Sequence, residues 1–143
     1  MNRFVNRIFS FALLAVMAGA GAAQAAQQAT FHLPFEAKWG TVTLPPGDYR
    51  LALPQLSLGS YHFFVNGQEA RGYVAPVSTD INSTNFQHPE RSYLLLVKVD
   101  GMFHVAQFQS GPNRAIFSFK VPKPSHRVEM ASQEAVNLDI SGN

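Results

Sequence analysis

The chain has no cysteine among its 143 residues, and this absence excludes two classes of small protein. A disulfide-stabilised mini-protein needs several cysteines for its cross-links, and a zinc site built on thiolates needs them as ligands. Charged residues are also few, at 14%, whereas aromatic residues make up 12% of the chain. Because disordered chains have few aromatic residues and a high net charge, this composition predicts a folded protein with a hydrophobic core.

Long hydrophobic runs are lacking except at the N-terminus, where residues 1–25 have the pattern of a secretory signal peptide. Arg3 and Arg7 make its start positive, an apolar run follows, and Ala23 and Ala25 are the small residues that signal peptidase recognises. The run is shorter than the roughly 20 apolar residues of a membrane span. The pattern predicts cleavage after Ala25 and a secreted or periplasmic protein; an uncleaved N-terminal anchor is the alternative.

The predicted mature chain, which lacks this segment, has no net charge of either sign. Cleavage after Ala25 leaves 143 − 25 = 118 residues, and the loss of two arginines leaves 11 − 2 = 9 basic residues against 9 acidic ones. Binding to nucleic acid requires clustered lysines and arginines, and residues 26–143 contain no such cluster. We therefore expect no nucleic-acid partner, no membrane span after cleavage, and a single domain over residues 26–143.

Apolar side chains after the leader recur at every second position. Phe31, Leu33 and Phe35, for example, alternate with His32 and Pro34, which is the period of a half-buried β-strand. Turn-forming residues separate many such runs along the chain. The pattern predicts an all-β fold, a single antiparallel β-sandwich or flattened barrel of about eight short strands.

The predicted strands differ in how they begin, end and connect. Pro34 favours an edge position for the first strand, because proline cannot donate to a sheet ladder. Asn66-Gly67 and Asp100-Gly101 each predict a two-residue type I′ turn, and residues 76–91 are expected to form a long polar loop. For the last alternating run, a short helix that begins at Ser132 is the alternative prediction. Strands are expected at 30–35, 41–44, 49–53, 61–65, 68–75, 92–99, 102–109, 115–121 and, more weakly, 128–130 and 136–140.

One N-terminal pattern extends beyond the strand period. It consists of Phe31-x-Leu33-Pro34-Phe35, then Gly40, then the run from Leu44 through Pro45-Pro46-Gly47-Asp48 to Tyr49. The pattern resembles the "V-P-F … G … L-P-A-G-x-Y" opening of a group of small exported bacterial β-proteins whose function is uncharacterised. This chain departs from the pattern at two positions: Leu33 replaces the usual β-branched residue, and Pro46 replaces the usual alanine. The resemblance covers about the first third of the predicted mature chain and implies export and a β fold, without catalytic or ligand-binding residues.

Motifs for catalysis and for cofactor binding are lacking. The chain has no Gly-x-Ser-x-Gly nucleophile elbow and no glycine-rich phosphate loop. None of its five histidines forms a close pair with metal-ligand spacing, although His62 and His104 lie on predicted strands that could meet across a sheet. We therefore predict no catalytic residue, no metal and no cofactor. A hydrolase would need a His–acid pair or two carboxylates from Glu36, Asp48, Glu69, Asp80, Glu90 and Asp100.

Aromatic residues near turns are the best candidates for binding, because an exposed ring can stack on a sugar or anchor a protein partner. Trp39 stands in a short turn segment, and Phe86 lies in the long polar loop. For Trp39 the favoured interpretation is instead that it fills the open end of the sandwich, because a small β-domain needs large residues in its core. The predicted binding residues are Trp39, Tyr61, Tyr73, Phe86 and His88.

These observations favour an exported, non-catalytic β-domain that acts as a protein- or glycan-binding or structural module of the cell envelope. It would present the loop at residues 76–91, together with Trp39, to a protein or glycan partner. One alternative is a carrier that holds a small apolar ligand in a cavity lined by Phe63, Leu95, Phe117 and Phe119. A small hydrolase is a further, less favoured alternative, and it predicts a His–acid pair or two acids in a cleft.

Overall fold

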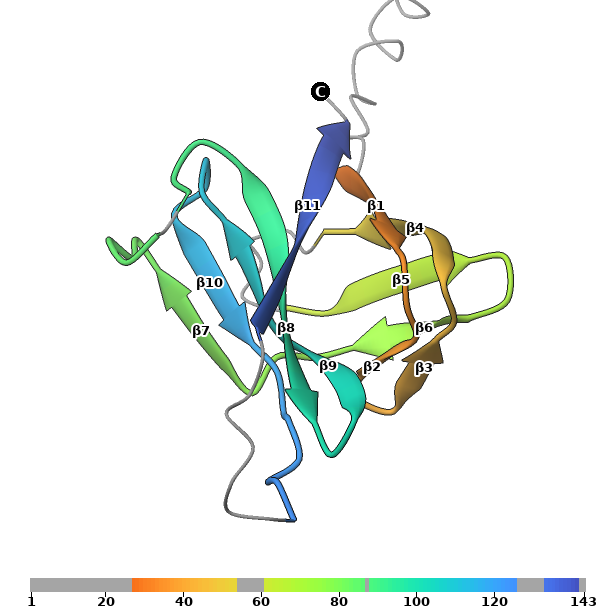
Figure 1. The fold of residues 1–143 in the computed structure, drawn as a ribbon. Helices are drawn as coiled ribbons and strands as arrows, with labels where there is room; N and C mark the ends of the chain where they lie inside the picture. Colours follow the sequence, from red (N-terminus) through yellow and green to blue (C-terminus); the bar gives the residue numbers. More distant parts are fainter. Residues whose placement is uncertain (1–26, 54–60, 87, 126–132, 142–143) are drawn as a thin grey trace, which may run out of the picture.

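The computed structural model describes residues 27–53, 61–86, 88–125 and 133–141, which contain eleven β-strands and no helix. The strands form two mostly antiparallel sheets (Figure 1). The all-β prediction is therefore confirmed, with more strands than the sequence suggested. The strands are β1 (Gln28–Leu33), β2 (Ala37–Trp39), β3 (Val42–Leu44), β4 (Gly47–Ala52), β5 (Phe63–Gly67), β6 (Arg71–Val74), β7 (Ser78–Ile81), β8 (Ser92–Val99), β9 (Met102–Ser110), β10 (Ala115–Ser118) and β11 (Gln133–Ser141).

Hydrogen-bonded neighbours follow the order β3-β2-β9-β8-β11-β1-β4-β5-β6, and β10 and β7 extend the sheet from β9. We call β1, β4, β5 and β6 sheet A, and β2, β3 and β7 to β10 sheet B. The strand β11 pairs with β8 along its first part and with β1 at its end, so it joins the two sheets (Figure 1). Among the described strands, every pairing is antiparallel except that of β2 with β9.

The two ends of this path come together, so the sheets curve into a flattened barrel. A Cβ atom placed on Gly72 of β6 would lie 2.6 Å from Cγ2 of Val42 on β3. This contact leaves no room for a side chain at position 72. The close approach of β3 and β6 closes the fold by packing, without a ladder of hydrogen bonds between the two strands.

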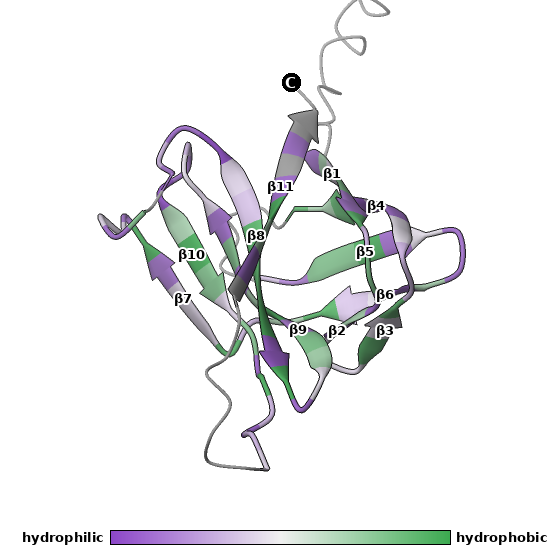
Figure 2. Cartoon of the chain, viewed as in Figure 1, coloured by the Kyte–Doolittle hydropathy of each residue, from purple (hydrophilic) through white to green (hydrophobic). Residues whose placement is uncertain are grey.

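The core lies between the inner faces of the two sheets and is rich in aromatic rings. Ring centroids in its centre are 5.1–6.1 Å apart, and most of the pairs have edge-to-face or tilted geometry, which aromatic rings prefer. Figure 2 shows hydrophobic residues along much of β5 and β10 and a hydrophilic loop between β5 and β6. The central rings belong to Trp39, Phe63, Phe108, Phe117 and Phe119.

The two predicted type I′ turns have different outcomes. Asp100 and Gly101 both have positive φ, at 48° and 81°, and they connect β8 to β9 as expected. The prediction at Asn66-Gly67 is wrong, because neither residue has a positive φ and both lie within β5. Packing requires glycine at position 67, because a Cβ atom there would overlap the Tyr49 ring.

Two other local predictions are wrong. The first strand is no edge strand, because β1 is paired with β4 on one side and β11 on the other. Pro34 lies just beyond the end of β1, where its missing N–H interrupts no ladder. The predicted loop at 76–91 contains the strand β7, whose polar sequence fits a strand at the border of a sheet.

The C-terminal alternation is confirmed as a strand over Gln133–Ser141. Other predictions concern parts of the chain outside the described residues: the signal peptide at 1–25, the alternation at 128–130 and the helix start at Ser132. Within the described ranges, no helix is long and apolar enough to cross a membrane.

Candidate functional site

The outer face of sheet A carries an open groove of about 960 Å³. Its walls come from β1, β4, β11 and the connection between β5 and β6. The groove is built on paired strands, so its shape is set by a rigid hydrogen-bonded scaffold rather than by one loop. The groove therefore offers a partner a prepared surface.

Strand register determines which side chains reach this groove. On β1 and β4, His32 lies opposite Asp48, and Thr30 lies opposite Arg50. Phe31 and Tyr49, which lie between them along the two strands, are buried. Because successive residues of a strand point to opposite faces, the four polar side chains project outward together.

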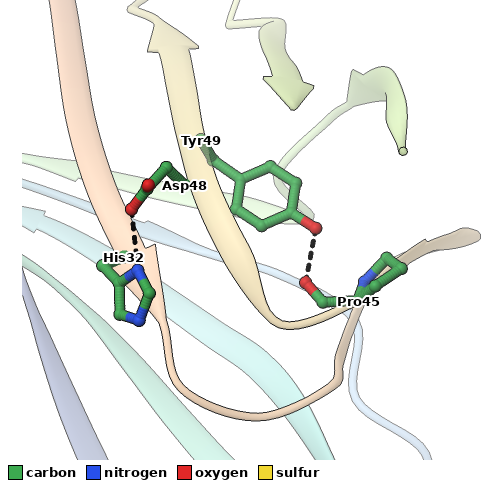
Figure 3. Close-up of polar contacts among 4 residues, drawn as sticks. All are labelled: His32, Pro45, Asp48 and Tyr49. Atoms are coloured by element: carbon green, nitrogen blue, oxygen red, sulfur yellow. Dashed lines mark hydrogen bonds and ion pairs between the residues drawn. The ribbon is translucent and has the colours of Figure 1, made fainter. Parts of the chain in front are cut away.

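His32 and Asp48 form a hydrogen-bonded pair in the groove, with 2.7 Å between Nδ1 and Oδ1 (Figure 3). Their side chains are 64% and 90% exposed, so water solvates both groups. The hydrolase alternative predicted such a His–acid pair in a cleft. A serine-type mechanism would also require a hydroxyl held by the imidazole, and within the described residues no Ser or Thr hydroxyl is hydrogen-bonded to His32.

Tyr49 stiffens the hairpin below the groove. Its hydroxyl donates to the Pro45 carbonyl oxygen at 2.5 Å (Figure 3), and its ring stacks on Phe31 at 5.4 Å. Burial raises the pKa of the Tyr49 hydroxyl, and the negative charge of Glu69 raises it further. The tyrosine therefore stays neutral and keeps its donated hydrogen bond well into the alkaline range.

The groove is acidic although the chain as a whole is nearly neutral. Four carboxylates line it, and Arg50 is the one lysine or arginine among the lining residues that the structure describes. Among the described residues, four of the eight carboxylates and one of the eight lysines and arginines thus line the groove. This separation of charge creates a local negative potential that favours a cationic partner. The carboxylates belong to Asp48, Glu69, Glu134 and Asp139.

The loop that follows β7 is fastened to the turn between β9 and β10. The Gly111 N–H donates to the Arg91 carbonyl at 3.1 Å, and the Ser83 N–H donates to the Arg114 carbonyl at the same distance. A Cβ atom on Gly111 would lie 2.5 Å from the Pro89 carbonyl oxygen, so the loop backbone wraps closely around this glycine. A smaller hollow of about 380 Å³ lies here, with Phe86 on one wall.

Trp39 is completely buried, with 0% of its surface exposed. The hypothesis that it is presented to a partner is wrong, and the favoured interpretation, that it fills the interior of the fold, is confirmed. Its ring packs against Phe31, Phe63 and Phe119 at 5.1–6.4 Å. Position 39 lies on β2, whose alternation turns the indole toward the core even though it comes just before a turn.

The other predicted binding residues do not gather at one place. Tyr73 is 72% exposed on β6, with its ring 4.7 Å from that of Phe64. Tyr61 is half-buried and packs on a core ring. Phe86 and His88 are also half-buried, in the loop that is fastened to sheet B, and His88 Nδ1 lies 3.6 Å from the carboxylate of Glu90.

His62 and His104 differ in their surroundings. His62 is exposed, whereas His104 is buried on β9 opposite Lys38. Burial lowers the pKa of His104, and the positive charge of Lys38 lowers it further. In the part of the chain that the structure describes, no three His, Asp or Glu side chains are placed to hold a metal ion.

The lining proposed for an apolar carrier is not present as predicted. Phe63, Phe117 and Phe119 are buried and fill the core by packing on one another. Leu95 is only partly buried and lies outside this cluster, because the alternation of β8 places Leu94 and Leu96 in the core. The four side chains therefore do not surround one common space.

Sequence reasoning missed the groove because no run of neighbouring residues encodes it. His32 and Asp48 are 16 positions apart, and they meet only through the pairing of β1 with β4. The alternation of each strand was visible beforehand, and it correctly indicated that His32 points away from the core. Comparison with protein-family models, curated proteins and solved structures finds no match for this chain.

Proposed function

We propose that this protein is an exported, non-catalytic β-domain that binds a partner in the acidic groove on the outer face of sheet A. The signal-peptide pattern of residues 1–25 supports export, as does the resemblance of the N-terminal pattern to exported bacterial proteins. The single observation that carries the proposal is the concentration of four carboxylates in one open groove built on paired strands.

The charge of the groove points to a protein partner with an extended, lysine- or arginine-rich segment. Complementary charge steers such a segment to the groove and sets its register. A sugar ligand needs an exposed aromatic ring on which to stack, and the groove's aromatic residues, Phe31 and Tyr49, are buried. Among the partners expected from the sequence, a basic protein segment therefore suits this groove better than a glycan.

The binding should be weak per contact and sensitive to salt. An ion pair between exposed groups contributes about 0.2–1 kcal/mol, so the affinity has to come from several carboxylates acting together. Exposed charges are screened over about 10 Å at 0.1 M salt. Moderate salt should therefore release the partner without unfolding the domain.

The test measures the affinity of a peptide in which lysine alternates with glycine, by titration calorimetry at low and at moderate salt. The variant Glu69→Gln/Glu134→Gln/Asp139→Asn neutralises three groove carboxylates and should weaken binding by about tenfold or more, or about 1.4 kcal/mol. The matched control Glu36→Gln/Asp80→Asn/Glu90→Gln removes the same charge from exposed positions outside the groove. Equal weakening by both variants would show that only net charge matters and would contradict the proposal.

Glycan binding is a second candidate function, and the observation that favours it is the exposure of Tyr73. Its ring lies beside that of Phe64 on the paired strand, and Asn66 and Arg71 follow on the same outer face. This arrangement joins a stacking surface to hydrogen-bonding side chains. Tyr73→Ala should then abolish retardation in gels that contain a polysaccharide, whereas the groove variant should keep it; no retardation of the wild-type chain would exclude this function.

A further inference from the structure

The edge strand β7 exposes apolar side chains at both of its ends. Among the described strands it pairs with β10 alone, and Figure 1 shows it at the outer border of sheet B. Three large hydrophobic side chains are exposed in the described part of the chain, and two of them lie at this strand. Val77, which is 66% exposed, directly precedes β7, and Ile81, which is 39% exposed, is its last residue. An uncovered apolar edge is a ready-made surface for another strand.

Register shows on which face these side chains lie. Thr79 pairs with Phe117 and Ile81 with Ala115, and both partners on β10 are buried in the core. Paired residues of neighbouring strands point to the same face of a sheet. Val77, Thr79 and Ile81 therefore continue the core-facing side of sheet B beyond the region that sheet A covers.

The sequence of β7 is complementary to itself when two copies run antiparallel about Thr79. In this register Val77 of one copy faces Ile81 of the other, twice, and Thr79 faces Thr79. Asp80 faces the hydroxyl of Ser78, which can donate a hydrogen bond to a carboxylate. A register centred on Asp80 would instead place two carboxylates opposite each other, which is unfavourable.

We propose that two copies of this chain associate through β7, which forms a continuous antiparallel sheet across a two-fold axis. The occupant is a second copy because this register matches apolar with apolar residues and separates the two Asp80 carboxylates. A contact of one short strand per copy buries less than the roughly 1,200 Å² of a stable interface, so the dimer is weak and depends on concentration. The groove of sheet A plays no part in this contact.

The experiment is sedimentation equilibrium of the exported protein over a dilution series. The average mass should rise with concentration toward that of two chains. The variant Val77→Lys/Ile81→Lys places lysine opposite lysine at both ends of the contact and should weaken association by about tenfold or more. The variant Val77→Glu/Ile81→Lys places glutamate opposite lysine at both ends, so it should still associate and should dissociate on addition of salt.

Three results would overturn the proposal. The wild-type chain could stay monomeric at every concentration, which leaves the edge to a different protein or to none. The two double variants could lose association equally, which contradicts the register. The control Tyr73→Lys changes an exposed residue of β6, and an equal loss there would place the contact on sheet A. Unfolding curves of all three variants verify that the fold is kept, since each replaced side chain is exposed.

Discussion

The strands β1 and β7 both alternate their side chains, yet only β1 hides every second one. On β1, Ala29, Phe31 and Leu33 are at most 5% exposed, and two strands flank them. On and beside β7, Ile81 and Val77 are 39% and 66% exposed, with one flanking strand. The comparison teaches that burial depends on the neighbours a strand acquires, because the local pattern only decides which side chains point the same way.

The largest expected effect contrasts the covered core with the uncovered edge. Phe63→Ala removes a ring that contacts four other core rings, and it should lower the free energy of unfolding by about 3–5 kcal/mol. Ile81→Ala shortens a partly exposed side chain and should cost less than about 1 kcal/mol. Urea unfolding of the monomeric chain measures both, and equal losses would break the comparison.

A smaller effect is expected where sheet A is closely packed behind the groove. Gly67→Ala inserts a methyl group into the space of the Tyr49 ring and should cost about 1–3 kcal/mol through overpacking. The neighbouring substitution Gln68→Ala, at an exposed position, serves as the control and should stay within about 0.5 kcal/mol. If both variants unfold at the same urea concentration as the wild type, the placement of the ring is wrong.

Tyr49→Phe removes the hydrogen bond to the Pro45 carbonyl and should cost about 0.5–1.5 kcal/mol. The pKa of Tyr49 is raised in the folded state, so the unfolded chain loses this proton first. The stability that the neutral phenol contributes is therefore complete below its ordinary pKa of 10.0 and is lost as pH rises through the folded-state value. Unfolding at alkaline pH should show this loss in the wild type and in the control Tyr73→Phe, but not in Tyr49→Phe.

The smallest effect concerns His104 and is confined to acid conditions. Its pKa is lowered in the fold, so the unfolded chain binds the proton first. The stability linked to neutral His104 is complete above the ordinary pKa of 6.5 and is lost as pH falls through the folded-state value. His104→Gln should flatten this part of the stability profile, and identical profiles for His104→Gln and the wild type would contradict the assignment.

Local features of the fold were predictable where they depend on a few adjacent residues. The strand Ser92–Val99 has the predicted bounds, and the turn at Asp100-Gly101 has the predicted positive φ angles. The same reasoning was wrong at Asn66-Gly67, where both residues pair with β4 as part of β5 and the Tyr49 ring occupies the space of a Cβ at position 67. A dipeptide signal describes what the backbone can adopt, and a distant side chain can select a different conformation.

The candidate site was less predictable than the fold. Tyr73 was expected to be exposed and is, whereas Trp39, named as a binding candidate although burial was the favoured interpretation, is completely buried. The pairing of His32 with Asp48 needed the register of β1 against β4. Neither the depth of an aromatic residue nor a contact across a sheet is encoded by the residues on either side of it.

Sequence alone determined the all-β class, most strand positions and the set of side chains that share a face, because a strand's period of two is a local property. Tertiary structure alone decided which of those faces are covered. Strands distant in the chain had to pair before four carboxylates could line one groove and before β7 could be left at the border with Val77 and Ile81 exposed. Burial and charge clustering are properties of the assembled sheets, since they depend on neighbours that no short segment contains.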